Sequence, residues 1–208
     1  MHTQTKDSQA ALTIQESIDH LMNGNSRFLQ GTPSKRDYQS QIGETSTGQY
    51  PFAAVLSCID SRIPTEVVFD QGIGDIFNAR IAGNFINEDI LGSLEFACKL
   101  AGSKVIMVLG HTSCGAVKGA CDHAKLGNLT QMLDKIMPAV NDTTTAEGEA
   151  RDSSNLDFVN RVSAQNVRHA IKQIRTNSEV LSKMESDGEI LIIGAMYDVS
   201  SGKVSRLE

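Results

Sequence analysis

Two apolar stretches, residues 52–57 and 104–109, constrain the fold of this chain more than any other feature. Each is apolar on both faces of an extended strand, and such strands are typical of a parallel sheet covered by helices on both sides. Side chains that bind metals follow each stretch: Cys58 follows the first, and His111 and Cys114 follow the second. Because sites in α/β proteins form beyond the carboxyl ends of parallel strands, the sequence predicts one site built from both.

The rest of the chain predicts an α/β domain with a mainly parallel central sheet flanked by helices. Further strands are expected over residues 75–81 and 189–196, and a hairpin turn after Val199 predicts a C-terminal antiparallel edge strand. The polar residues 31–50 favour a loop. Helices are expected over residues 64–69, 87–100, 115–121, 129–140, 155–175 and 179–184.

The N-terminal residues predict an amphipathic helix. Thr13 and Glu16 match a capping box, and apolar residues then recur at helical spacing until Gly31. We interpret residues 1–31 as a helical arm whose apolar stripe is covered either by its own domain or by a second subunit. At 208 residues the whole chain, 1–208, is expected to form a single domain.

Composition excludes several functional classes. A formal net charge of -6 gives no basic footprint for nucleic acid. No run approaches the roughly 18 apolar residues of a membrane span, and the N-terminus has no secretory apolar core. Four irregularly spaced cysteines suit metal binding in a reducing compartment better than a disulfide framework. We therefore expect a soluble cytoplasmic protein, although the residues leave open whether a leader preceded Met1.

The strand-end residues predict a catalytic zinc site. Cys58, His111 and Cys114 supply three ligands and leave a fourth position open for water, which zinc activates at neutral pH. Asp60 and Arg62 are spaced by two residues, so in extended chain they face the same way and can pair beside the metal. The guanidinium would keep the carboxylate ionised.

These two motifs resemble those of the β-class carbonic anhydrases. Residues 58–62, Cys-Ile-Asp-Ser-Arg, match that family's Cys-x-Asp-Ser-Arg motif, and residues 111–114 match its His-x-x-Cys motif. The similarity runs from about residue 52 to 122 and again over 194–198. It implies one zinc ion per chain and reversible hydration of carbon dioxide to bicarbonate by a zinc-bound hydroxide. In that reaction Asp60 orients the hydroxide and Arg62 holds Asp60.

The resemblance also implies substrate-pocket residues. Gln49 matches a glutamine that hydrogen-bonds substrate, often across a dimer interface, and Phe77 matches an aromatic wall. Phe96 replaces a tyrosine, and Ala82 belongs to a run that departs from the family's usual sequence. Gly115, directly after the second motif, is assigned to the same pocket.

One subset of the family is inhibited by bicarbonate in a second site built from Trp, Arg and Tyr. Arg80 and Tyr197 match two of these residues, but Val55 stands at the Trp position, and the chain has no Trp. The resemblance therefore implies the constitutively open form, with Asp60 off the metal.

Other interpretations are possible from the sequence alone. Cys121 and His123 could join Cys114 in a rival zinc site, whereas Cys98 is expected to be a core residue. The zinc site could act on carbon disulfide or carbonyl sulfide, or the domain could be a non-catalytic zinc scaffold or redox sensor. The N-terminal stripe and Gln49 predict a homodimer or a dimer of dimers.

Overall fold

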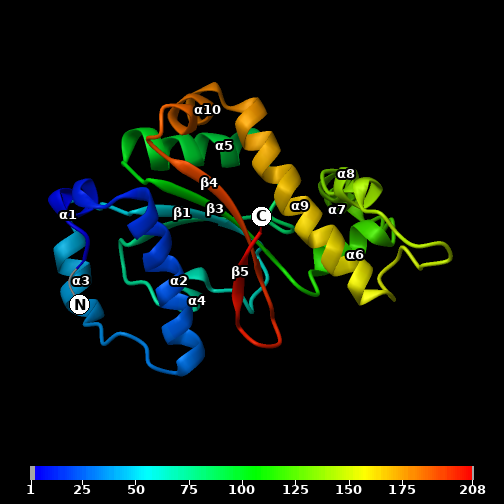
Figure 1. The fold of residues 1–208 in the computed structure, drawn as a ribbon, viewed down its shortest axis with the longest axis horizontal. Helices are drawn as coiled ribbons and strands as arrows, with labels where there is room; N and C mark the ends of the chain where they lie inside the picture. Colours follow the sequence, from blue (N-terminus) through cyan, green and yellow to red (C-terminus); the bar gives the residue numbers. More distant parts are fainter. Residues whose placement is uncertain (1–2, 208) are drawn as a thin grey trace.

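The two apolar stretches form neighbouring strands at the centre of a five-stranded sheet in the computed structural model, which describes residues 3–207 (Figure 1). The order is β2-β1-β3-β4-β5. Strands β1 to β4 are parallel and β5 is antiparallel to β4, as the sequence predicted. The expected domain also included residues 1, 2 and 208, which lie outside the described part. The strands are β1 Ala53–Ser57, β2 Ile76–Arg80, β3 Val105–His111, β4 Leu191–Tyr197 and β5 Val204–Arg206.

Helices cover both faces of the sheet, because alternate strand residues enter two separate cores. Val55 and Met107 lie in the core shared with α2, α4 and α6 to α8, whereas Leu56 and Ile106 lie in the core shared with α5, η1 and α10. The helices are α1 Lys6–Ala11, α2 Ile14–Gln30, α3 Tyr38–Thr45, α4 Thr65–Val68, α5 Glu88–Glu95, the π-helix η1 Phe96–Leu100, α6 Gly115–Cys121, α7 Gly127–Asp134, α8 Met137–Asp142, α9 Leu156–Asn177 and α10 Glu179–Ser186.

Helix α2 packs on its own domain, which decides between the two possibilities left by the sequence. It begins at the predicted capping box and ends at Gly31 in the left-handed conformation. Ile18 and Leu21 of its apolar stripe are buried. A Cβ on Gly24 would lie 1.7 Å from the carbonyl oxygen of Phe69, so only glycine permits this close contact. The domain itself therefore covers the centre of the stripe, whereas Leu29 near its end remains 45% exposed.

Two sequence predictions were wrong in detail. Residues 31–50 contain α3, which Asp37 caps by accepting hydrogen bonds from the backbone of the first turn. This polar helix has no apolar periodicity that would have revealed it. The single helix expected over 129–140 is divided into α7 and α8, because Pro138 lacks a backbone donor and is accommodated in the first turn of a new helix.

Helix α9 connects the two cores. It packs against α6 and α8 near its start and against α10 near its end (Figure 1). Phe158 and Val162 lie in the core that contains residues of α6 to α8, whereas Ala170 and Ile174 lie in the core that contains residues of α10. The helix thus runs past the carboxyl ends of β1 and β3, where the candidate site lies. Among the helices of residues 3–207, none combines the length and the apolar character needed to cross a bilayer.

Candidate metal centre

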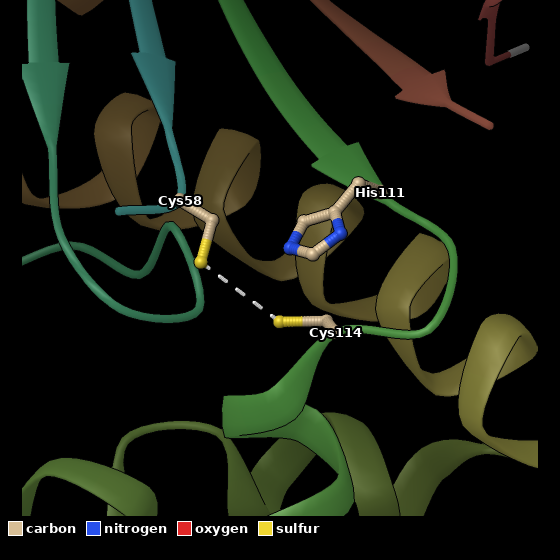
Figure 2. Close-up of side chains that lie close together, drawn as sticks. All are labelled: Cys58, His111 and Cys114. Atoms are coloured by element: carbon tan, nitrogen blue, oxygen red, sulfur yellow. Dashed lines mark hydrogen bonds between the residues drawn. The ribbon is translucent and has the colours of Figure 1, made fainter. Parts of the chain in front are cut away.

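The predicted metal ligands converge at the carboxyl ends of β1 and β3. Cys58 follows β1, His111 is the last residue of β3, and Cys114 directly precedes α6 (Figure 2). Their ligand atoms all lie within 4.8 Å of one another, and the two Sγ atoms are 4.0 Å apart. All three side chains are buried. The fold therefore brings the Cys58 thiol together with His111 and Cys114, which lie more than fifty residues further along the chain.

The geometry of this cluster fits a zinc ion. Two thiolates at about 2.3 Å from a tetrahedral zinc would have their sulfurs about 3.8 Å apart, close to the 4.0 Å found here. His111 Nδ1 lies 2.9 Å from the carbonyl oxygen of Thr112 and must donate to it, which leaves the Nε2 lone pair free. That Nε2 is buried without a hydrogen-bond partner. A buried imidazole nitrogen that has a free lone pair and lies beside two thiols is typical of a metal-binding histidine, whose other nitrogen donates to a carbonyl oxygen.

The protonation of the two thiols is linked. The hydrogen bond from Cys114 lowers the pKa of Cys58 to about 4, and the backbone N–H of Gly83, 3.3 Å from Cys58 Sγ, also favours the thiolate. The same contact, with burial, raises the pKa of Cys114. Without a cation, Cys58 is therefore the thiolate and Cys114 is the thiol that donates its proton to it. A bound cation would replace that proton.

Asp60 and Arg62 form a two-pronged ion pair beside the cluster. Arg62 Nε and Nη2 lie 2.9 and 2.7 Å from Asp60 Oδ1 and Oδ2. These hydrogen bonds lower the pKa of Asp60 to about 2, so its carboxylate is ionised at neutral pH. Asp60 Oδ2 is 3.9 Å from His111 Nε2, which places the carboxylate next to the ligand set without making it one of the three clustered ligands.

Arg80 supports the loop that carries Cys58 and Asp60. Its Nε donates to the carbonyl oxygen of Cys58 at 2.9 Å, and its Nη2 donates to that of Asp60 at 2.7 Å. Both peptide groups are therefore fixed from the neighbouring strand β2. The family resemblance implied a different role for Arg80, as one member of a bicarbonate site.

The expected pocket residues do not all lie near the ligands of their own chain. Ala82 directly precedes Gly83, which contacts Cys58, and Gly115 is the first residue of α6 after Cys114. Phe77 and Phe96 instead pack against each other with ring centres 6.1 Å apart, at the opposite end of β2. Gln49 lies in a shallow hollow next to Thr45 and Gly74.

Phe77 is remote from the metal centre because of strand register. It pairs with Ala54, four residues before Cys58 along β1. Four residues of strand correspond to about 13 Å. Within one chain, neither this aromatic pair nor Gln49 completes the pocket.

The rival zinc site is not formed in the described residues. Cys121 and His123 are not members of the cluster, and burial raises the pKa of Cys121 to about 11. Cys98 is 2% exposed in the core, and burial raises its pKa to about 12, so it is a core residue as predicted.

Two polar contacts near the site had no signal in the sequence. Asn160 Oδ1 accepts a hydrogen bond from the backbone N–H of Ser113 at 2.9 Å, and Asn166 Nδ2 donates to the carbonyl oxygen of Gly83 at 2.7 Å. Both asparagines belong to α9. Periodicity placed them on a long helix but could not indicate which loops that helix contacts.

Comparisons with known proteins agree with this geometry. The family model described as carbonic anhydrase matches residues 53–204. The chain is 33% identical to a carbonic anhydrase of Mycolicibacterium smegmatis over 88% of each chain. It is 31% identical to carbonic anhydrase 2 of Mycobacterium tuberculosis, over 88% of this chain and 87% of that protein.

Solved structures share the fold. A β-carbonic anhydrase of Aspergillus fumigatus aligns with a TM-score of 0.69 at 24% identity, covering 93% of this chain and 90% of that one. One of two tetrameric β-carbonic anhydrases from Sordaria macrospora aligns with a TM-score of 0.70 at 20% identity, covering 92% of this chain and 97% of that one.

Proposed function

Since the chain belongs to the β-class carbonic anhydrase family and thus catalyses the reversible hydration of carbon dioxide, we propose that the reaction takes place beside Cys58, His111 and Cys114. One observation carries this proposal. The three ligand atoms converge within 4.8 Å at the sheet edge where Arg62 holds the Asp60 carboxylate. The resident ion is zinc, which the ligand set fits.

Zinc bound by these ligands would lower the pKa of a water ligand to about 7 and so supply a nucleophile at neutral pH. Asp60 accepts a hydrogen bond from the attacking water through Oδ2, the carboxylate oxygen near His111, and thereby directs a lone pair toward carbon dioxide. Arg62 occupies the other directions around that carboxylate and keeps it from rotating. Asp60 thus acts as an orienting acceptor, because a group with a pKa of about 2 is a poor base at neutral pH.

Metal analysis combined with a stopped-flow hydration assay tests this assignment. We expect one zinc per chain in the wild type and in Asp60→Asn, with hydration by Asp60→Asn slower by about 10²-fold or more, since the amide cannot accept at both positions. Asp134→Asn, an exposed carboxylate on α7, is the matched control and should keep the wild-type rate. Wild-type activity in Asp60→Asn would refute the role of Asp60, and metal-free active protein would refute the site.

We further propose that the enzyme is constitutively open. Val55 is fully buried where bicarbonate-inhibited relatives would have Trp, and Arg80 is already engaged by the carbonyl oxygens of Cys58 and Asp60. Arg62 pairs with the Asp60 carboxylate, whose Oδ2 lies 3.9 Å from His111 Nε2. A crystal of the zinc-loaded protein grown near pH 8 should show Asp60 paired with Arg62. An Asp60 oxygen bound to zinc would overturn the proposal.

A second copy of the chain completes the substrate pocket in our proposal. Phe77 and Phe96 lie away from the ligands of their own chain, and Phe96 is 50% exposed. Leu100, on the same π-helix, is 76% exposed. An apolar surface next to the aromatic pair suits a homodimer that places these rings at the partner's site, and two such dimers could form a tetramer. Ile18 and Leu21 of the α2 stripe do not support the dimer, since their own domain buries them.

The compartment follows from thiol chemistry. All four cysteines are free, and the two ligand thiols must stay reduced to hold zinc. We therefore place the protein in a reducing, cytoplasmic environment. Fractionation of its native cells, with blotting for the chain, tests this placement, and an oxidising compartment would contradict it.

A further inference from the structure

Helix α9 contacts both loops that carry the metal ligands, through two asparagine side chains. Asn160 Oδ1 accepts from the N–H of Ser113 at 2.9 Å, and Ser113 lies between His111 and Cys114. Asn166 Nδ2 donates to the carbonyl oxygen of Gly83 at 2.7 Å, and the N–H of Gly83 donates to Cys58 Sγ. One helix therefore fixes the peptide groups on both sides of the cluster.

The donor and acceptor roles of the two amides are decided by their partners. A backbone N–H can only donate, so Asn160 must present its oxygen to Ser113. A backbone carbonyl can only accept, so Asn166 must present its NH₂ group to Gly83. The two side chains, although chemically identical, thus make opposite hydrogen bonds.

The Asn160 contact restrains backbone that is unfavourable without support. Ser113 has φ 56°, a left-handed conformation that costs a non-glycine residue about 1–2 kcal/mol. Gly83 has φ 80° and lies against Ile136, where a Cβ would be 2.5 Å from the Ile136 side chain. Helix α9 is a firm support for these loops, because Phe158 and Val167, near the two asparagines, are fully buried.

We propose that Asn160 and Asn166 are positioning residues that hold the metal ligands in binding geometry: Asn160 acts through Ser113 on His111 and Cys114, and Asn166 acts through Gly83 on Cys58. Neither touches substrate or the reacting atoms. The proposal rests on the proposed zinc site but is independent of which substrate that site turns over.

Metal affinity is the direct test. Zinc affinity is measured by competition with a chelator, and geometry is measured from the thiolate-to-cobalt charge-transfer bands of the cobalt(II)-substituted protein. Asn160→Ala and Asn166→Ala should each weaken zinc binding by about 10- to 100-fold and shift those bands. Asn177→Ala, an exposed asparagine at the end of the same helix, is the matched control and should change neither.

The isosteric Asp variants test the assigned hydrogen bonds. Asn160→Asp keeps an acceptor for the N–H of Ser113 and should retain near wild-type zinc affinity. Asn166→Asp loses the donor to Gly83 and opposes a carbonyl with a carboxylate, so it should lose affinity by at least as much as Asn166→Ala. Equal affinities in Asn160→Asp and Asn166→Asp would overturn the proposal.

Loss of folding and loss of positioning are separable. Thermal unfolding of the metal-free variants measures stability alone, and a purely structural role would lower the melting temperature without moving the cobalt bands, which overturns the proposal. If Asn166→Ala yields no folded protein, the zinc affinities of Asn160→Ala and Asn160→Asp are compared instead. Equal affinities in these two variants would also refute the proposal. A wild type that binds zinc but does not hydrate carbon dioxide would refute the proposed function and leave this inference intact.

Discussion

The guanidinium of Arg62 holds both carboxylate oxygens of Asp60, with Nε 2.9 Å from Oδ1 and Nη2 2.7 Å from Oδ2. The backbone N–H of Arg62 adds a third hydrogen bond to Oδ1 at 3.0 Å. The same Nη2 lies 3.4 Å from the carbonyl oxygen of Ser113, so the pair also connects the two loops of the metal centre. The orientation of the Asp60 carboxylate is therefore set by two hydrogen bonds from the planar guanidinium of Arg62, and not by the positive charge of Arg62 alone.

Arg62→Lys should retain zinc but lose about 10- to 100-fold in hydration rate. Lysine supplies the charge as a single point and cannot hold both oxygens in one plane, so Asp60 can rotate. Zinc content and stopped-flow hydration measure the two effects separately. Arg168→Lys, on the exposed side of α9, is the control and should change neither. A wild-type rate in Arg62→Lys would show that charge suffices.

Asp70→Asn should lower the free energy of unfolding by about 3 kcal/mol. The Asp70 carboxylate pairs with Arg27 and with Arg36, whose side chain is 4% exposed, and losing the carboxylate charge breaks this buried ion pair. Urea unfolding measures the change, with Asp134→Asn as an exposed control. A loss below 1 kcal/mol would contradict the expected role of this pair.

The same residue predicts a pH dependence of stability. Burial alone would raise the pKa of Asp70, but the hydrogen bonds from Arg27, Arg36 and Ser34 outweigh it and lower the pKa below its ordinary value. Because the folded pKa lies below the unfolded value of about 3.9, its stabilisation is complete above that pH and is lost as pH falls through the folded pKa. Wild type should therefore lose more stability than Asp70→Asn on acidification below pH 4. Parallel curves would refute this contribution.

Gly83→Ala should destabilise the fold by about 2–3 kcal/mol and weaken zinc binding. The new Cβ would meet both the positive φ and the Ile136 side chain at 2.5 Å, and relief would move the N–H that contacts Cys58. Gly148→Ala is the matched control, because its φ is 76° but nothing lies within 4 Å of the new Cβ. It should show only the smaller conformational cost and keep its zinc. Equal effects of the two substitutions would exclude crowding at Gly83.

Leu100→Asp should shift the proposed dimer to monomer and lower hydration activity, because a charge would be buried at the apolar interface. Size-exclusion chromatography with light scattering measures the assembly. Leu126→Asp is a close control, since Leu126 on the α7 side is 72% exposed against 76% for Leu100. A monomeric wild type, or a Leu100→Asp variant that remains a fully active dimer, would refute the interface.

The central sheet and the metal ligands could be predicted from local sequence, whereas other parts of the fold could not. Strands β1 and β3 are apolar up to their carboxyl ends, and capping at Thr13 is a contact between residues three apart. Helix α3 was missed because its polar residues carry no periodic signal. The position of Phe77 relative to the ligands depends on strand register, which residue spacing does not encode.

The sequence by itself determined the α/β class, the ligand set Cys58, His111 and Cys114, and the family, because motif spacing and strand hydrophobicity are local properties of the chain. Only the tertiary structure decided that α2 is covered by its own domain and that Asn160 and Asn166 support the metal loops. The two asparagine contacts join residues that are 47 and 83 positions apart. They form only when helices pack on the finished sheet, where the fit of buried surfaces, rather than local pattern, determines which polar groups meet.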